Sequence, residues 1–349
     1  MVSRRSSDLH LTCGHLIAFR VDGDIVREEK GPPLSPAMLE HLLLPIIPDF
    51  KRAQFAKFWD VDFAYALAGV GRFRVNLFRD NHGVGAVFRY IPDKVLTLEE
   101  LGAPDALFNF CKMAKGLVLV TGPTGSGKST TQAAMIDFIN EARHEHIITI
   151  EDPIEFVHPQ KKCLINQREV GKHTESFSQA LRAALREDPD VVLVGELRDL
   201  ETTSIALETA ETGHLVFGTL HTNTAVSTID RVIDQYPTEQ QRIIRNTLAA
   251  SLRGVVTQVL CRKKEGGRCA AYEILVTDDA VAAMIREGKN HMIPSHMQTQ
   301  KAAGNRLLNE SLLKLVMEGL VDYEEAWKKS INRKEFEETL KKKGGSRAA

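Results

Sequence analysis

Residues 117–129 read Leu-Val-Leu-Val-Thr-Gly-Pro-Thr-Gly-Ser-Gly-Lys-Ser, a short apolar run followed by a glycine-rich turn. The run is typical of a buried strand, and residues 128–141 after the turn are typical of a helix. Gly122 to Ser129 match G-x-x-x-x-G-K-[ST], a loop whose backbone N–H groups surround phosphate at a helix N-terminus. This stretch predicts a nucleotide-binding domain of the α/β class.

The loop residues have separate expected tasks. The glycines let the backbone approach phosphate, Lys128 reaches the terminal phosphates, and the Ser129 hydroxyl can hold Mg²⁺. A glycine-rich turn without a ligand is the alternative, but the flanking strand and helix favour binding. ATP and Mg²⁺ are therefore the expected cofactors. The expected nucleotide-binding residues are Gly122, Pro123, Thr124, Gly125, Ser126, Gly127, Lys128, Ser129 and Thr130.

Past Lys115 the sequence alternates short apolar runs with helix-like segments, which is typical of a parallel sheet covered on both faces. The expected strands span residues 117–120, 147–150, 191–194 and 215–219. Ligands of open α/β sheets bind at the carboxyl ends of the strands. The polar residues at these ends are therefore the candidates for chemistry.

Acidic residues follow the second and third expected strands. Glu151, Asp152 and Glu155 could order Mg²⁺ or an attacking water, and a solvated acidic turn would look the same. Glu196 is the first acidic residue after the third apolar run, where a carboxylate can orient water in line with a γ-phosphate. The alternative for Glu196 is a structural ion pair with Arg198.

Two histidines, His214 and His221, bracket the fourth expected strand. They could sense the γ-phosphate through hydrogen bonds, and a purely structural role is equally open. A zinc site is disfavoured because no Cys or Glu cluster completes a ligand set.

The first 90 residues have a different organisation. Short runs of strand character surround a helix-like middle at residues 36–57, with Asp22-Gly23 as an expected hairpin turn, which predicts an α+β domain. We expect this domain over residues 1–92, a linker over 93–112, and the nucleotide-binding domain with a helical C-terminal region over 113–349.

Composition limits the partners. Lys and Arg number 45 against 46 Asp and Glu, so no overall field attracts nucleic acid. The five cysteines, Cys13, Cys111, Cys163, Cys261 and Cys269, include no Cys-x-x-Cys pair and indicate reduced thiols in a cytosol. No secretory signal opens the chain, and no apolar run reaches the roughly 18 residues that span a bilayer. We expect a cytoplasmic protein without direct membrane insertion.

Several longer motifs resemble those of the secretion-type ATPases, most closely the PilT/PilU type IV pilus retraction ATPases. The likeness covers nearly the whole chain. Its signs in the first domain are Ser7-Asp-Leu-His-Leu-Thr, Gly71-Arg-Phe-Arg-Val-Asn and Val87-Phe-Arg-Tyr-Ile-Pro. Beyond the phosphate loop, residues 149–156 look like the family's aspartate box, 188–199 like its atypical Walker B motif, and 210–223 like its histidine box.

The resemblance implies a PAS-like N-terminal domain joined to a RecA-like ATPase domain, with six copies forming a ring at the inner membrane. It implies that Glu196 is the catalytic base, that Glu151, Asp152 and Glu155 belong to the aspartate box, and that His214 and His221 belong to the histidine box. Arginines complete the site across the subunit interface in such rings. The candidates are Arg72, Arg74 and Arg89; surface arginines on edge strands are the alternative.

Pilus retraction against an inner-membrane platform protein is the function that the resemblance favours. The four-cysteine zinc site of the assembly ATPases is absent, and residues 280–287 retain the Ile-Arg-Glu core of a retraction signature, Ala-Ile-Arg-Asn-Leu-Ile-Arg-Glu. An accessory retraction paralogue, a pilus assembly or type II secretion ATPase, and a non-hydrolysing nucleotide switch remain open. A DNA-translocating motor is disfavoured by the balanced charge.

Overall fold

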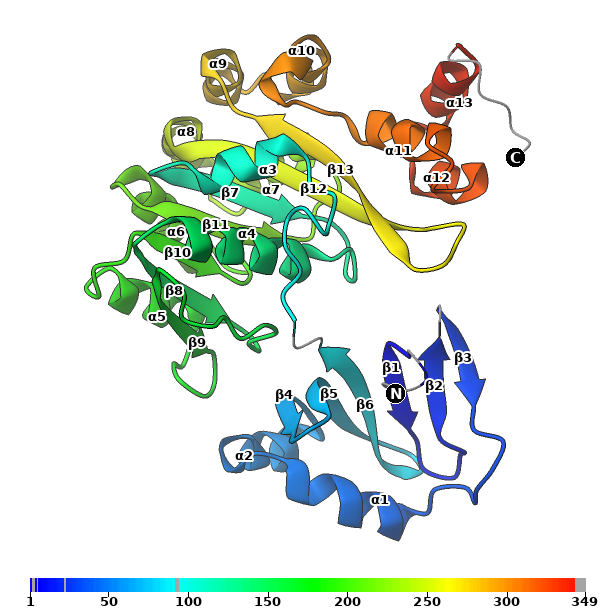
Figure 1. The fold of residues 1–349 in the computed structure, drawn as a ribbon. Coiled ribbons are helices and arrows are strands. Elements are labelled where there is room, and N and C mark those ends of the chain that lie inside the picture. The colour runs from blue at the N-terminus through cyan, green and yellow to red at the C-terminus, as the bar shows by residue number, and fades with distance from the viewer. Residues whose placement is uncertain (2–3, 5, 22, 92–93, 343–349) are drawn as a thin grey trace. The chain divides into compact units, whose positions relative to one another are not determined.

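The structure is a computed structural model that describes residues 1, 4, 6–21, 23–91 and 94–342 (Figure 1). Outside the description lie Asp22 of the expected hairpin turn, residues 92–93 at the expected domain boundary, and residues 343–349. The chain divides into an N-terminal unit of residues 1–95, 151–157 and 168–176 and a C-terminal unit of residues 96–150, 158–167 and 177–349. None of the described helices combines the length and the apolar character needed to span a membrane.

An antiparallel sheet forms the N-terminal unit. Its spatial order is β3-β2-β1-β6-β5-β4, with strands β1 (Asp8–Leu11), β2 (Ala18–Val21), β3 (Asp24–Arg27), β4 (Asp60–Leu67), β5 (Gly71–Asp80) and β6 (Gly83–Ile91). Its helices are α1 (Pro36–Leu43) and α2 (Asp49–Phe58), joined by a 3₁₀ helix at Leu44–Ile46. Ser35 caps α1 by accepting a hydrogen bond from the Met38 N–H, and Pro36 takes a first-turn position that needs no N–H.

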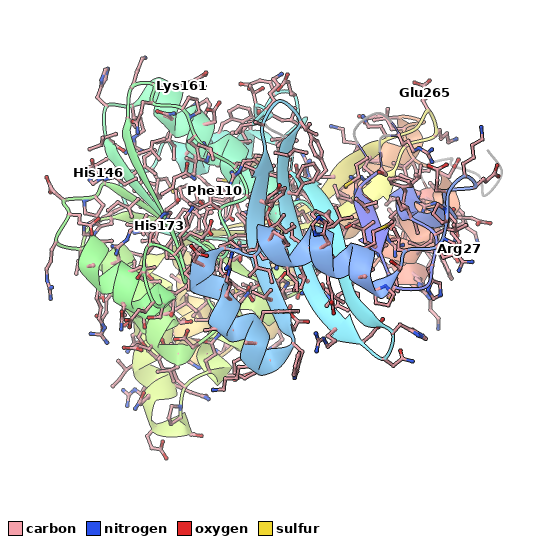
Figure 2. All side chains as sticks on the ribbon, turned by 90° about the horizontal axis from the view of Figure 1, so that it is seen from below. Arg27, Phe110, His146, Lys161, His173 and Glu265 are labelled. Carbon is pink, nitrogen blue, oxygen red and sulfur yellow. The ribbon has the colours of Figure 1, made fainter. Side chains whose placement is uncertain are left out.

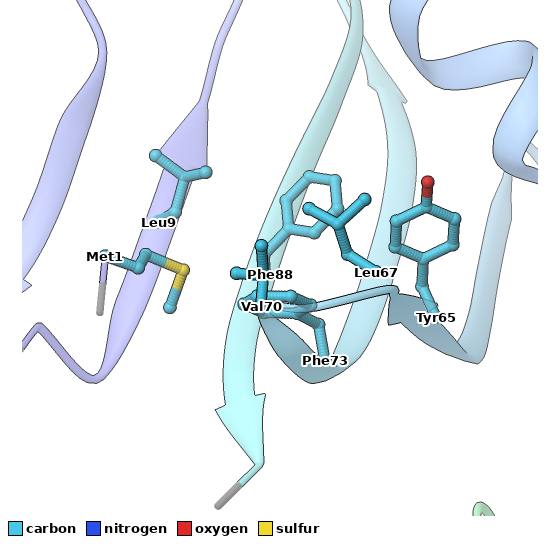
Figure 3. Close-up of a pocket in the computed structure, with 7 residues that line it drawn as sticks. All are labelled: Met1, Leu9, Tyr65, Leu67, Val70, Phe73 and Phe88. Carbon is cyan, nitrogen blue, oxygen red and sulfur yellow. The ribbon is translucent and has the colours of Figure 1, made fainter. Parts of the chain in front are cut away.

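Alternation along β5 decides which face of this sheet is covered. Phe73, Val75 and Leu77 belong to the core that includes residues of α1 and α2, so Arg72 and Arg74 lie on the opposite face. On the apolar face there is also an open pocket of about 620 Å³ (Figure 3). Its lining side chains are apolar apart from the Tyr65 hydroxyl, so they do not suit phosphate. They are Met1, Leu9, Tyr65, Leu67, Val70, Phe73 and Phe88.

A seven-stranded sheet forms the centre of the C-terminal unit, in the order β13-β12-β7-β11-β10-β8-β9. The strands are β7 (Gly116–Thr121), β8 (His146–Glu151), β9 (Leu164–Glu169), β10 (Val191–Val194), β11 (Leu215–Leu220), β12 (Leu252–Arg262) and β13 (Arg268–Val276). β12, β7, β11, β10 and β8 run parallel, and β13 is antiparallel to β12. The four expected strands are confirmed, whereas β9, β12 and β13 were not expected.

Helices cover both faces of this sheet (Figure 1). The helices of this unit are α3 (Asp105–Cys111), α4 (Lys128–Ala142), α5 (Phe177–Ala184), α6 (Leu200–Glu211), α7 (Ala225–Asp234), α8 (Thr238–Ser251), α9 (Asp279–Glu287), α10 (Ile293–Thr299), α11 (Leu308–Met317), α12 (Tyr323–Lys329) and α13 (Arg333–Lys342), with 3₁₀ turns at Asn290–Met292 and Lys301–Ala303. The α/β fold class, with a smaller α+β N-terminal unit, is confirmed.

Two hydrophobic cores of the C-terminal unit hold these layers together. α3 and α4 share one core with Val118 and Val120 of β7, and α6 contacts β7 from the other face. α3 lies within residues 93–112, the expected linker, and buries Leu107 and Phe110 in this core. The helices α11 to α13 form a separate core with Cys261 of β12, here called the C-terminal helical cluster.

The segment between β8 and β9 contains a buried histidine that makes stability depend on pH. His158 is 8% exposed, and burial lowers its pKa from 6.5 to about 4. Nearby, Lys161 (Figure 2) lies 2.8 Å from the carboxylate of Asp137. The unfolded chain binds a proton at His158 between these two pKa values and the folded chain does not, so stability falls as pH drops from about 6.5 to about 4.

We therefore predict that His158→Gln reduces the loss in free energy of unfolding that occurs as pH falls below 7. Between pH 7 and pH 5 the wild-type chain should lose about 2 kcal/mol more free energy of unfolding than the variant. Urea unfolding at both pH values measures this difference, with His146→Gln at a half-exposed histidine (Figure 2) as the control. Parallel pH dependences of wild type and His158→Gln would contradict the assignment.

Candidate active site

The phosphate loop connects β7 to α4, and two of its glycines, Gly122 and Gly127, lie close to Gln258 of β12. Gly122 has φ 139°, and a Cβ there would lie 2.3 Å from the carbonyl oxygen of Gln258. Gly127 has φ 88°, and its Cβ would lie 2.9 Å from Nε2 of Gln258. Both positions therefore favour glycine for conformation, and Gly122 also requires it for space. The loop rests directly on β12.

The loop and the start of α4 present donors suited to phosphate. The residue before α4 is Gly127, and no side chain caps the helix, so its first N–H groups lack the usual side-chain acceptor. Lys128 Nζ donates to the carbonyl oxygens of Gly122 (2.8 Å) and Pro123 (3.1 Å), which holds the ammonium over the loop. The buried Ser126 hydroxyl has no hydrogen-bond partner among the described residues. These features fit a bound nucleotide.

A hard cation fits only with the help of phosphate oxygens. Ser129, the second residue of α4, is half-buried and supplies one hydroxyl at the loop. Within the described part of the chain, no group of three or more His, Cys, Asp or Glu side chains could hold a metal ion. Mg²⁺ bound between Ser129 and nucleotide oxygens is consistent with this donor set.

Glu196 and His221 are brought together next to Lys128. They follow β10 and β11; β11 pairs with β7, and β10 pairs with β11. His221 Nε2 lies 3.2 Å from Oε1 of Glu196, and Lys128 Nζ lies 3.4 Å from His221 Nδ1. With Nδ1 accepting from Lys128, the imidazole proton resides on Nε2, the atom that lies next to Glu196. The structure therefore joins the phosphate-loop lysine to the candidate base through one imidazole.

The ion pair of Glu196 with Arg198, which was the alternative role considered for this glutamate, is also present. Arg198 Nε donates to Oε2 of Glu196 at 2.8 Å, so one carboxylate oxygen contacts Arg198 and the other contacts His221. The Leu197 N–H donates to the Thr219 carbonyl oxygen at 3.0 Å, and the Thr219 hydroxyl donates to the Gly195 carbonyl oxygen. These bonds fix the backbone on both sides of Glu196, whose side chain is 23% exposed.

His214 lies at the amino ends of the strands, opposite the phosphate loop. It precedes β11, and its carbonyl oxygen accepts a hydrogen bond from the N–H of Gly116, the first residue of β7. Its Nδ1 lies 3.0 Å from the carbonyl oxygen of Thr209. The length of β7, about 17 Å, therefore separates His214 from the phosphate loop of the same chain. Only His221 of the pair reaches this site.

The aspartate-box residues begin at the last residue of β8 and continue in the N-terminal unit. The Glu151 carbonyl oxygen accepts from the Val170 N–H at 2.9 Å. Arg72 donates to the carbonyl oxygens of Ile154 (2.9 Å) and Glu155 (3.4 Å). Asp152 belongs to the same segment, which is thus fixed by backbone contacts.

Each candidate arginine has a partner within the N-terminal unit. Arg74 lies 3.7 Å from the Asp62 carboxylate and 4.0 Å from that of Glu155. Arg89 donates to the buried carboxylate of Asp8 at 2.9 Å. β5 and β6 are interior strands, so the alternative of surface arginines on edge strands is wrong in that respect. Any action on a neighbouring chain stays a prediction.

Sequence reasoning missed the polar residues of β12 that support the site. Gln258 Nε2 donates to the Ser126 carbonyl oxygen at 2.6 Å, and Thr257 shares a 2.8 Å hydrogen bond with Thr121 at the end of β7. Both residues are buried. The signal was a Thr-Gln pair inside the apolar run of residues 255–261.

Comparisons with known proteins agree with the resemblance found in the sequence motifs. The chain matches the family described as "Type II/IV secretion system protein" over residues 4–328. It is 52% identical to the "Type IV pilus retractation ATPase PilT" of Pseudomonas aeruginosa, over 93% of this chain and 94% of the relative. It is 48% identical to a "Twitching motility protein" of Neisseria gonorrhoeae, over 94% of this chain and 89% of that one.

A solved structure, "Crystal Structure of the Pilus Retraction Motor PilT and Bound ADP", superposes with a TM-score of 0.86 at 47% identity and covers 97% of this chain and 96% of that chain. The expected secretion-ATPase fold is thereby confirmed. The chain belongs to the type II/IV secretion system protein family and is a nucleotide-binding ATPase.

Proposed function

We propose that this chain is the motor of type IV pilus retraction, acting as a homohexameric ring that hydrolyses ATP with Mg²⁺. The observation that carries ATP hydrolysis is the contact series from Lys128 through His221 to Glu196, at 3.4 and 3.2 Å. Retraction is supported by 52% identity to a pilus retraction ATPase over nearly the full length of both chains.

Each residue at the strand ends has a task in this mechanism. Lys128 and the first N–H groups of α4 bind the β- and γ-phosphates, and the Ser129 hydroxyl supplies a ligand to Mg²⁺, which neutralises phosphate charge when bound. Glu196 orients and deprotonates the attacking water. His221 contacts both Lys128 and Glu196, so loss of the γ-phosphate changes the surroundings of all three side chains. We assign His221 the role of γ-phosphate sensor.

In a ring of subunits, the candidate arginines, His214 and the aspartate box can act on the nucleotide of a neighbouring subunit. An arginine of a neighbouring subunit neutralises charge that develops on the γ-phosphate, and Arg72, Arg74 and Arg89 are the candidates. The same arrangement leaves His214 and the aspartate box, Glu151, Asp152 and Glu155, to act at the subunit interface. The ring works at the cytoplasmic face of the inner membrane, against a platform protein.

Two comparisons favour retraction over the other motor functions. Identity is 38% to the "Type IV pilus ATPase PilU" and 33% to the "Type II secretion system protein HxcR", both of Pseudomonas aeruginosa, against 52% to PilT. A nucleotide switch without turnover does not need a carboxylate held where Glu196 is. Retraction is therefore the function proposed, ahead of an accessory or assembly role.

Deleting the gene from a piliated host tests this proposal. We expect non-motile cells with more surface pili than the parent, because assembly continues while retraction stops. Twitching-zone diameter and pilus counts measure both effects, and wild-type protein but not Glu196→Gln should restore motility. Cells without pili would indicate assembly, and unchanged motility would contradict a required retraction motor.

A further inference from the structure

A buried carboxylate lies behind the active site. Glu273 of β13 is 6% exposed and faces the starts of two helices. Its Oε1 accepts from the N–H of Ala225, the first residue of α7, at 2.8 Å. Its Oε2 accepts from the N–H of Leu308, the first residue of α11, at 3.4 Å. One side chain therefore supplies an acceptor to two helix N-termini.

No cationic side chain of the described residues acts on this carboxylate. Burial raises the pKa of Glu273, and the bonds from Ala225 and Leu308 oppose the rise. Both neighbours are donors, so the ionised carboxylate fits them, and the partial positive charge of each helix N-terminus replaces a counterion. Stabilisation of this buried charge is thus shared between α7 and α11.

The α7 side of this contact leads to the active site. Only three residues separate His221 from Ala225, and the turn between them is ordered by its own bonds. Thr224 accepts from the Ser227 N–H at 3.0 Å, and the Thr222 and Thr228 hydroxyls lie 2.7 Å apart. The Thr228 hydroxyl also lies 3.5 Å from that of Thr121, where β7 enters the phosphate loop. These bonds connect the turn after His221 with the start of α7 and with the end of β7.

The α11 side leads to the C-terminal helical cluster. α11 has no side-chain cap of its own, so Glu273 takes that place. Several hydrogen bonds hold α11 on β13. Ile274 and Arg306 exchange two backbone bonds of 2.8 and 2.9 Å, and the Tyr272 N–H donates to the Ser311 hydroxyl at 3.0 Å. Leu308 itself is buried in the cluster. α11 and β13 thus form one body, to which Glu273 joins the start of α7.

We infer that Glu273 is a positioning residue that couples the His221 turn to the C-terminal helical cluster, so that nucleotide bound at the phosphate loop is detected at α11. This inference rests on the proposed function, in which His221 senses the γ-phosphate. It adds a route by which that change leaves the active site. Glu273 touches neither nucleotide nor water in this role and acts only through α7.

Amide hydrogen exchange of the full-length protein with a non-hydrolysable ATP analogue tests the coupling. In the wild type the analogue should slow exchange in both residues 225–228 and residues 308–313. In Glu273→Gln, whose amide can accept only one of the two N–H groups, slowing should persist at 225–228 and disappear at 308–313. We expect kcat to fall about tenfold, because the variant loses one of the two hydrogen bonds that position α7 and α11. KM should stay within about twofold, because the residues that bind nucleotide remain.

Asp278→Asn is the matched control, since Asp278 caps α9 through the Val281 N–H at 2.8 Å and lies outside the contact series. It should lower the melting temperature without changing kcat or the response of residues 308–313. No analogue response at 308–313 in the wild type would overturn the inference even if Glu273→Gln did not fold. A preserved response in Glu273→Gln would also overturn it. Because the analogue is not hydrolysed, the result is independent of whether Glu196 is the base.

Discussion

Lys128→Ala is expected to lower ATP affinity at least tenfold and turnover at least 100-fold. The Lys128 ammonium lies over the phosphate loop, 2.8 Å from the Gly122 carbonyl oxygen and 3.1 Å from that of Pro123. Bound phosphate oxygens offer it stronger, charge-assisted hydrogen bonds, each worth about 1.5–3 kcal/mol. Alanine removes these bonds and the charge together. Titration with a fluorescent ATP analogue and a phosphate-release assay measure the two effects.

Lys115→Ala is the control for that change. Lys115 is an exposed lysine directly before β7, at the end of the strand away from the loop. Its removal should leave affinity and turnover within about twofold of wild type. Equal losses in the two variants, or no loss in Lys128→Ala, would mean that the loop is not the nucleotide site.

Glu196→Gln is expected to reduce turnover at least 100-fold while ATP affinity stays within about threefold. Glutamine has nearly the shape of glutamate and can still accept from Arg198, so the local fold should persist. It cannot take a proton from water, and proton transfer by a placed base contributes about 100- to 10,000-fold. Single-turnover hydrolysis beside analogue binding separates the two quantities.

Glu211→Gln, at the exposed end of α6, is the control for this substitution and should behave as wild type. If Glu196 served only its ion pair with Arg198, Glu196→Gln would lower thermal stability and leave turnover nearly unchanged. That result would remove Glu196 from the mechanism.

The sequence predicted the parts of the site that depend on local geometry. A buried strand, a glycine-rich turn and a helix are encoded within residues 116–142, and the carboxyl ends of neighbouring parallel strands meet, so Glu196 and His221 could be placed near Lys128 in advance. The sequence motif groups His214 with His221, but a residue that precedes a parallel strand lies at its amino end, so the structure separates His214 from the site.

Contacts between distant parts of the chain were not predictable in this way. Arg89 and Asp8 are 81 residues apart, and they meet only because β6 pairs with β1, an order that periodicity does not reveal. β12 and β13 carry buried polar residues among apolar ones, which obscured their strand pattern. Glu273 in particular resembles an ordinary polar residue until α7 and α11 are placed against it.

Steady-state ATP hydrolysis by the purified chain, with its mass measured by light scattering in the same buffer containing Mg²⁺, tests the central claim most directly. A six-subunit particle that turns over ATP, and whose turnover is lost in Glu196→Gln, is the predicted result. A monomer that binds ATP without hydrolysing it would contradict the motor and indicate a nucleotide switch.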